Sequence, residues 1–168
     1  MLSICQMDPD HDTAQVRAMF WEYLHWANSR LNEEYGIAFD IEAMVHKTMS
    51  ELQTYSPPAG RLLLAKDGNR VVGIACMRRI GGDIGEIKRM YVQGAFRGQG
   101  IGRELLQKLL EEAREMGYST IRLDSARFME QAHSLYRSAG FREIEPYAAS
   151  EIPAEFHRHW VFMELDLL

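Results

Sequence analysis

The segment Arg97-Gly98-Gln99-Gly100-Ile101-Gly102 constrains the fold of this chain more than any other feature. A strand-like apolar run ends at Val92, and a strongly amphipathic run begins near Ile101, so a strand, a glycine loop and a helix follow one another. Backbone amides at a helix N-terminus lack internal partners and carry partial positive charge, which suits an anion such as a pyrophosphate. Glycines let the anion reach these amides, and the flanking Arg97 and Arg103 can add charge-assisted contacts.

Two other phosphate motifs fit these residues poorly. A P-loop requires a lysine after its last glycine, and this chain has Arg103 there. A dinucleotide fingerprint lacks its third glycine whether it starts at Gly98 or at Gly100. Asp124, at the end of the next strand, does resemble the ribose-binding acid of that fingerprint. One feature of two is insufficient, so a nucleotide-binding enzyme is the weaker alternative.

The remaining pattern predicts a mixed sheet flanked by helices, an α/β (α+β) fold. Helices are expected over 13–30, 41–52, 101–116 and 130–139. Strands are expected over 1–6, 61–66, 70–79, 84–92, 120–123, 141–145 and 160–167. Tight turns join the strands over 61–66, 70–79 and 84–92, which indicates an antiparallel meander.

Length and charge exclude several classes of protein. The 168 residues suit one domain spanning 1–168, and the net charge of -5 argues against nucleic acid as a partner. No run approaches the ~20 apolar residues of a membrane span, and no basic segment precedes a long apolar one, so we expect a cytoplasmic protein that does not associate with membranes. The His157-Arg158-His159 stretch lacks further ligands at suitable spacing, so no metal site is expected.

Three blocks, in this order, resemble the core of the GNAT superfamily of N-acetyltransferases. They are Glu86-Ile87-Lys88-Arg89-Met90-Tyr91-Val92, Phe96 to Gly102, and Leu135-Tyr136-Arg137-Ser138-Ala139-Gly140-Phe141. The resemblance implies a mixed, mostly antiparallel sheet of about seven strands flanked by about four helices. It also implies direct transfer of an acetyl group from acetyl-coenzyme A to a primary amine of a small molecule or peptide.

The resemblance further implies a cofactor site between the fourth and fifth strands, which splay apart in such enzymes. The backbone of Met90 and Val92 would bond the pantetheine amides. The pyrophosphate would be held beside Arg97 by the backbone amides of Gly98, Gln99, Gly100, Ile101, Gly102 and Arg103.

The reaction needs an acid for the departing thiolate and a base for the amine. Tyr136 matches the family's thiolate-protonating tyrosine; the structural alternative is a buried aromatic residue whose hydroxyl is satisfied by the protein. Glu86 is the expected base, with an exposed strand glutamate as the alternative. Four glutamates of the N-terminal helices are further candidates: Glu33, Glu34, Glu42 and Glu51.

One departure from the family concerns Met129, which stands where many members have a cofactor-contacting asparagine. A methionine cannot supply that hydrogen bond, which leaves an acetyl-coenzyme A-binding sensor with little catalysis as an alternative function. His133, one turn before Tyr136, is interpreted as a helix-surface residue, with tuning of Tyr136 as the alternative. Three aromatic residues of the first helix are interpreted mainly as core, with lining of the acceptor pocket as the alternative for some of them: Trp21, Tyr23 and Trp26. The sequence leaves the oligomeric state open, a homodimer included.

Overall fold

The computed structural model describes all residues from 1 to 168 and contains seven strands and four α-helices. The strands are β1 (Leu2–Gln6), β2 (Arg61–Asp67), β3 (Arg70–Gly81), β4 (Ile84–Val92), β5 (Thr120–Ala126), β6 (Arg142–Ile144) and β7 (Trp160–Asp166). The α-helices are α1 (Thr13–Tyr35), α2 (Ile41–Ser50), α3 (Ile101–Glu115) and α4 (Glu130–Ser138). Short 3-10 turns cover Leu52–Tyr55, Gly94–Phe96 and Ala154–His159.

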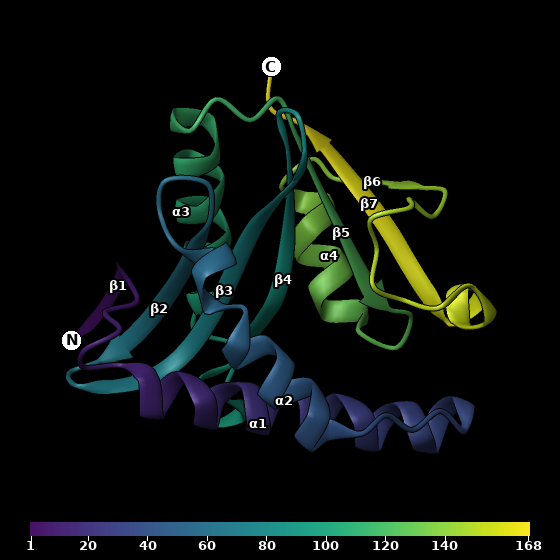
Figure 1. The fold of residues 1–168 in the computed structure, drawn as a ribbon, viewed down its shortest axis with the longest axis horizontal. Coiled ribbons are helices and arrows are strands. Elements are labelled where there is room, and N and C mark those ends of the chain that lie inside the picture. Colours follow the sequence, from purple (N-terminus) through teal and green to yellow (C-terminus); the bar gives the residue numbers. More distant parts are fainter.

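All seven strands form one sheet in the order β1-β2-β3-β4-β5-β7-β6 (Figure 1). Only β4 and β5 run parallel, and every other neighbouring pair is antiparallel. The predicted mixed, mostly antiparallel sheet flanked by four helices is therefore confirmed.

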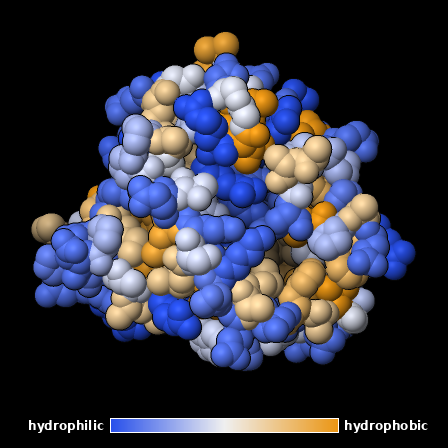
Figure 2. All heavy atoms as spheres, viewed as in Figure 1, coloured by the Kyte–Doolittle hydropathy of each residue, from blue (hydrophilic) through white to orange (hydrophobic).

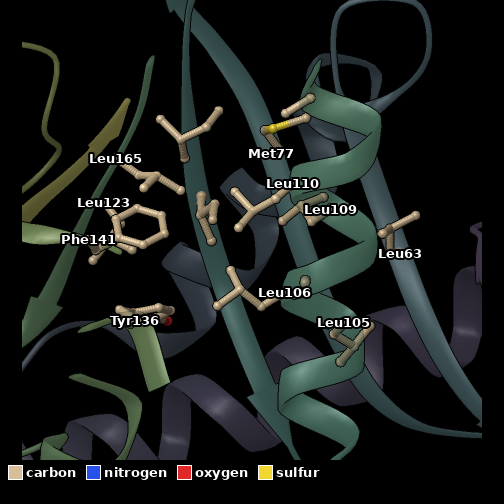
Figure 3. Packing of buried hydrophobic residues seen from close by; sticks show 14 of the residues in the cluster. Leu63, Met77, Leu105, Leu106, Leu109, Leu110, Leu123, Tyr136, Phe141 and Leu165 are labelled. Carbon is tan, nitrogen blue, oxygen red and sulfur yellow. The ribbon is translucent and has the colours of Figure 1, made fainter. Parts of the chain in front are cut away.

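Each face of the sheet carries its own apolar core, because side chains alternate along a strand. On β2, Leu63 packs with Leu105 and Leu109 of α3, in a core that also holds Tyr136 and Phe141 (Figure 3). The neighbouring Leu62 and Leu64 belong to the opposite core, which α1 covers. The face seen in Figure 2 is mostly hydrophilic, with hydrophobic side chains in scattered patches.

The parallel pair stays together for only part of its length. Residues Ile84–Ile87 of β4 pair with Thr120–Leu123 of β5, and beyond this point the two strands separate (Figure 1). The rest of β4 still pairs with β3, so its other edge is open toward the gap. An open gap between the fourth and fifth strands is what the resemblance implied.

The boundaries of several elements differ from the expectations. Helix α1 runs to Tyr35 and ends at Gly36, which adopts the left-handed conformation with φ 68°. Strand β5 extends to Ala126 because its far edge pairs with β7, whereas β6 has only three residues. Trp21 is 48% exposed, so the prediction that it lies in the core is wrong. No helix is both long enough and apolar enough to cross a membrane.

Candidate active site

The glycine segment forms the entrance to α3. Gly98 and Gly100 have φ values of 78° and 82°, a region that side chains with a Cβ rarely occupy. Gly100 precedes the first helical residue, and its carbonyl accepts the backbone N–H of Glu104. The space where a Cβ would stand is open at both glycines. The first amides of α3 therefore face a surface that a phosphate group can reach.

The open edge of β4 offers backbone groups beside this helix start. The N–H of Gln93 bonds β3 through the carbonyl of Val72, so the neighbouring Val92 directs its backbone groups to the gap. Met90 lies in the stretch of β4 where the pairing with β3 is irregular. Arg97 shows that the Val92 carbonyl faces outward, because its Nε donates to that oxygen at 3.0 Å. The Arg97 guanidinium lies over the rings of Trp26 and Tyr91, at 4.9 and 5.3 Å. An extended chain that pairs with Val92 has to displace this arginine.

A pocket of about 580 Å³ joins the glycine segment, the end of β4 and helix α4. Eight of the sequence-predicted site residues line it: Met90, Val92, Arg97, Gly98, Gly100, Ile101, Gly102 and Tyr136. Gln99 and Arg103 are exposed and do not line this pocket, and Arg103 borders a separate groove between α3 and α4. We call the 580 Å³ space the larger pocket.

Tyr136 is 6% exposed, and it packs against Phe141 with its ring centroid 5.7 Å from that ring (Figure 3). Its hydroxyl makes no hydrogen bond with another residue, unlike a purely structural buried tyrosine. Burial raises the pKa of Tyr136, and the charge of Asp124 acts in the same direction. The phenol therefore keeps its proton at neutral pH and has a free O–H to donate.

A second pocket of about 260 Å³ lies between helices α1 and α2 and the end of β5. Its walls are mostly apolar, with Leu24, Leu31, Phe39, Met44 and Trp160 among them. Four charged side chains also line it: Lys47, Arg89, Asp124 and Glu151. We call this space the smaller pocket.

Tyr23 and Met129 line both pockets. A small cavity beside them, about 50 Å³, is bordered by Tyr136 from the larger pocket and by Asp124 and Ser125 from the smaller one. The two pockets therefore meet at this junction. The Tyr136 phenol borders this place from the larger pocket and the Asp124 carboxylate from the smaller one.

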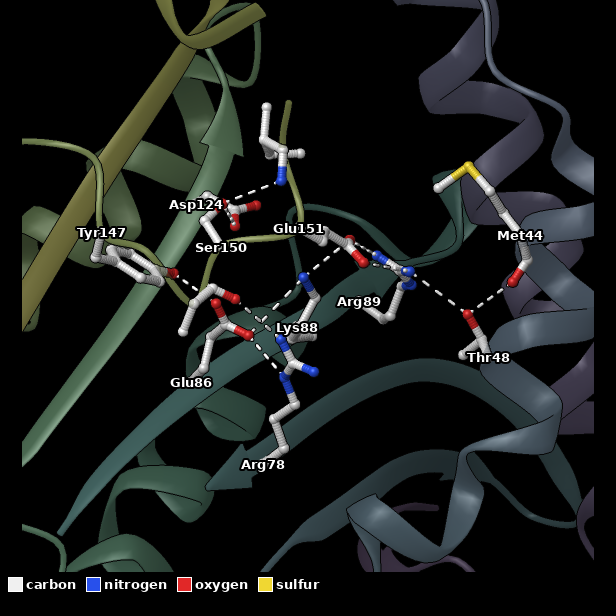
Figure 4. Close-up of polar contacts among 12 residues, drawn as sticks. Met44, Thr48, Arg78, Glu86, Lys88, Arg89, Asp124, Tyr147, Ser150 and Glu151 are labelled. Carbon is white, nitrogen blue, oxygen red and sulfur yellow. Dashed lines mark hydrogen bonds and ion pairs between the residues drawn. The ribbon is translucent and has the colours of Figure 1, made fainter. Parts of the chain in front are cut away.

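Glu86 lies on β4 behind this junction, and it is fully buried. Its Oε1 accepts Nε of Arg78 at 2.9 Å, and its Oε2 accepts the Tyr147 hydroxyl at 2.7 Å (Figure 4). Nζ of Lys88 is 3.9 Å from Oε1. Glu86 lines neither pocket. Its carboxylate has partners on both oxygens and attaches the loop between β6 and β7 to the sheet.

Glu151, in the same loop, joins two basic residues of β4. Its Oε1 lies 2.8 Å from Nζ of Lys88 and 2.7 Å from Nη1 of Arg89 (Figure 4). Burial opposes ionisation of Glu151, but Arg89 and Lys88 outweigh it and hold the pKa of this carboxyl well below its usual range. The loop that closes the smaller pocket is therefore secured by buried charge.

Comparison with known families identifies the chemistry. The model of the acetyltransferase (GNAT) family matches residues 14–141. The chain belongs to the GNAT acetyltransferase family. An uncharacterised N-acetyltransferase of Schizosaccharomyces pombe is 27% identical over 168 residues, which cover 99% of this chain and 95% of that protein. The uncharacterised N-acetyltransferase YjgM of Escherichia coli is 33% identical over 121 residues, 69% and 72% of the two chains.

Solved structures agree on the fold of this GNAT acetyltransferase. The PaiA N-acetyltransferase of Thermoplasma acidophilum, solved in complex with coenzyme A, superimposes with a TM-score of 0.76 over 99% of each chain, at 18% identity. The predictions of an N-acetyltransferase and of acetyl-coenzyme A as co-substrate are confirmed at the level of the family.

The other predicted bases of this GNAT acetyltransferase lie away from both pockets. Glu33, Glu34 and Glu42 are exposed, and Glu34 pairs with Arg30 on its own helix at 3.1 Å. Glu51 is half-buried at the end of α2 and lines neither pocket. Helices α1 and α2, which carry these candidates, do contribute to the wall of the smaller pocket, but the charged residue that α2 contributes is Lys47.

His133 corrects another prediction, because it is 3% exposed rather than a surface residue. Its Nε2 lies 2.9 Å from Oγ of Ser125, a wall residue of the smaller pocket. His133 and Tyr136 lie one helical turn apart on α4, and both are on its buried side. Burial lowers the pKa of His133, and the nearby charges of Arg137 and Arg127 add to this effect.

Proposed function

We propose that this chain transfers the acetyl group of acetyl-coenzyme A directly to a primary amine of a small molecule or peptide. The observation that carries the proposal is the junction where the larger and smaller pockets meet between Tyr136 and Asp124. The larger pocket joins the open edge of β4 to the start of α3, whose backbone groups would serve a pantetheine arm and a pyrophosphate. The smaller pocket, where Asp124 has no ion-pair partner, can hold the amine of an acceptor.

Binding of acetyl-coenzyme A would use the backbone rather than particular side chains. The backbone of Met90 and Val92 would pair with the pantetheine amides, as an added strand does at an open sheet edge. The free amides at the start of α3, beside Gly98 and Gly100, would hold the pyrophosphate. Arg97 would leave the Val92 carbonyl, and its guanidinium could then pair with a phosphate.

Tyr136 is proposed as the acid. Its O–H is free, and it lines both the larger pocket and the junction cavity, where the thioester sulfur would lie. Because the phenol stays protonated at neutral pH, it can donate to the sulfur as the carbon–sulfur bond breaks. A tyrosine that only filled the core would be expected to bond its hydroxyl to another protein group.

Asp124 is proposed as the group that takes the proton of the amine. Its carboxylate borders the smaller pocket and the junction cavity, and its one hydrogen-bond partner is the Ser150 hydroxyl at 2.8 Å. Glu86, the base predicted from the sequence, would first have to release Arg78 or Tyr147. We assign Glu86 the positioning of the loop over 145–153, which carries Ser150 and Glu151.

A panel of small primary amines and of peptides with a free N-terminus tests the proposed acetyl transfer. The protein is incubated with acetyl-coenzyme A and each amine, and both free thiol and N-acetylated product are measured. The proposal expects the two to appear in equal amounts for at least one class of amine. Acetyl-coenzyme A that raises the melting temperature without any product would support the sensor alternative instead.

A further inference from the structure

We infer that the acceptor is a free amino acid with an apolar side chain, bound in the smaller pocket through both its amine and its carboxylate. This inference rests on the proposed function, because it assigns the smaller pocket to the acceptor. It is carried by the charged groups of the pocket, by the pairing of Arg89 and by the apolar walls.

The charges around the smaller pocket do not suit a simple amine. The four charged wall residues are two cations and two anions, and Glu151 is shared between Arg89 and the neighbouring Lys88. With Lys88 and the Arg78–Glu86 pair, four positive and three negative side chains meet here. An ammonium ion alone would enter a pocket whose immediate surroundings already hold one more positive than negative side chain. A substrate that brings its own anion removes this conflict.

The ammonium and the carboxylate of such a substrate could each pair with a wall residue of opposite charge that has no ion-pair partner in the protein. Asp124 pairs with no cation and accepts only the Ser150 hydroxyl. Lys47, which extends from α2, forms no ion pair. Both residues line the same pocket. Asp124 also borders the junction cavity, so an ammonium beside it lies toward the acetyl group, with the carboxylate toward Lys47.

Arg89 provides a second cationic group for the carboxylate. Its side chain is 11% exposed, and its Nε is buried without a hydrogen-bond partner, although Nη1 and Nη2 bond Glu151 and Thr48. A buried charged donor left unpaired is costly, so this guanidinium keeps hydrogen-bonding capacity that the protein itself does not use. Arg89 also has φ 54°, the only residue other than glycine with a positive φ, and such strain is common where a side chain is held for binding.

Size and wall chemistry narrow the substrate further. The volume of about 260 Å³ lies below the range of roughly 300–1,000 Å³ for drug-sized ligands, so the pocket suits a single amino-acid residue, and the positive groups favour one with a free carboxylate. Beyond the charged groups, Leu24, Leu31, Phe39 and Trp160 form the wall. These side chains would surround an aliphatic or aromatic side chain and would not satisfy a polar one.

Matched acceptors test the inference. Leucine and phenylalanine are compared with leucinamide and phenylalaninamide, which keep the α-amine and the side chain, and with the decarboxylated 3-methylbutylamine and 2-phenylethylamine. We expect kcat/KM for the better amino acid to exceed that of its amide and its amine at least tenfold, about 1.4 kcal/mol. The comparison is stringent, because the amide's amine is less basic and more of it is neutral.

Lys47→Met should reduce the preference for the acid over the amide at least fivefold without changing the KM for acetyl-coenzyme A. Lys108→Met, on the outer face of α3, is the matched control and should keep the preference. Amides or simple amines acetylated as efficiently as the acids would overturn the inference and leave the proposed function standing. An absence of product from these acceptors and from every member of the wider amine panel would overturn both the inference and the proposed function.

Discussion

The hydroxyl of Tyr147 donates to Oε2 of Glu86 at 2.7 Å and joins two residues that are 61 positions apart in the chain. Arg78 occupies the other oxygen of Glu86, so the carboxylate connects β3, β4 and the loop after β6. Burial raises the pKa of Tyr147, and the charges of Asp124 and Glu86 act in the same direction, so the phenol remains a donor. The loop that carries Ser150 and Glu151 is thereby fixed against the sheet.

Substitutions of Asp124 and Glu86 distinguish the proposed base from the proposed positioning residue. Asp124→Asn should lower kcat by about 10²-fold or more, since general base catalysis usually contributes that much. Glu86→Gln should keep turnover within about tenfold and lower the stability by about 1–3 kcal/mol, because it removes the charge that Arg78 pairs with. Steady-state kinetics and thermal unfolding measure both. The reverse pattern, with turnover lost only in Glu86→Gln, would return the base to Glu86.

Tyr136→Phe should lower kcat by about 10²-fold or more and leave the KM for acetyl-coenzyme A nearly unchanged, because the lost interaction belongs to the transition state. The melting temperature should not change, since the hydroxyl bonds no other residue. Tyr118→Phe is the matched control: its hydroxyl donates to the carbonyl of Ala59. That variant should lose about 0.5–1.5 kcal/mol of stability and keep its turnover. Full turnover in Tyr136→Phe would remove the acid assignment.

Gly100→Val should weaken the binding of acetyl-coenzyme A at least tenfold, about 1.4 kcal/mol. The new side chain would fill the open space over the start of α3, where the pyrophosphate is proposed to lie. Gly117→Val is the control, because Gly117 has φ 85° just beyond the other end of the same helix. Both variants carry similar backbone strain of about 1–3 kcal/mol. Calorimetry should show weaker binding in Gly100→Val alone, and equal affinities in the two variants would contradict the phosphate site.

His133 should make stability depend on pH near neutrality. Its folded pKa is lowered, so the unfolded state binds more protons as the pH falls through the ordinary value of 6.5. The free energy of unfolding should therefore decrease from pH 7.5 to pH 5.5, with a slope of at most about 1.4 kcal/mol per pH unit. His133→Gln keeps a donor for Ser125 and should flatten this slope in urea titrations. An unchanged slope would mean that other groups cause it.

The local pattern was sufficient to predict the antiparallel meander of β2, β3 and β4. Alternating apolar residues and glycine turns marked β2, β3 and β4, and the glycines before Ile101 marked the start of α3. These signals depend on residues close together in sequence, so they can be recognised without the tertiary structure. The open gap beside Val92 followed from the family resemblance rather than from any residue.

The smaller pocket could not be predicted, because its charged residues come from distant segments. Glu151 lies in a loop without periodicity, and only the fold brings it to Arg89. Asp124 was weighed only as a ribose-binding acid, although a carboxylate at the end of a strand before a helix was a usable signal. The burial of His133 depends on how α4 packs on β5, which a nine-residue helix does not reveal.

A crystal structure of the protein with coenzyme A tests the central claim most directly. We expect the pantetheine arm to pair with the backbone of Met90 and Val92, and Arg97 to be displaced from the Val92 carbonyl. The sulfur should lie within about 3.5 Å of the Tyr136 hydroxyl, at the junction with the smaller pocket. Coenzyme A bound outside the gap between β4 and β5, or a sulfur remote from Tyr136, would contradict it.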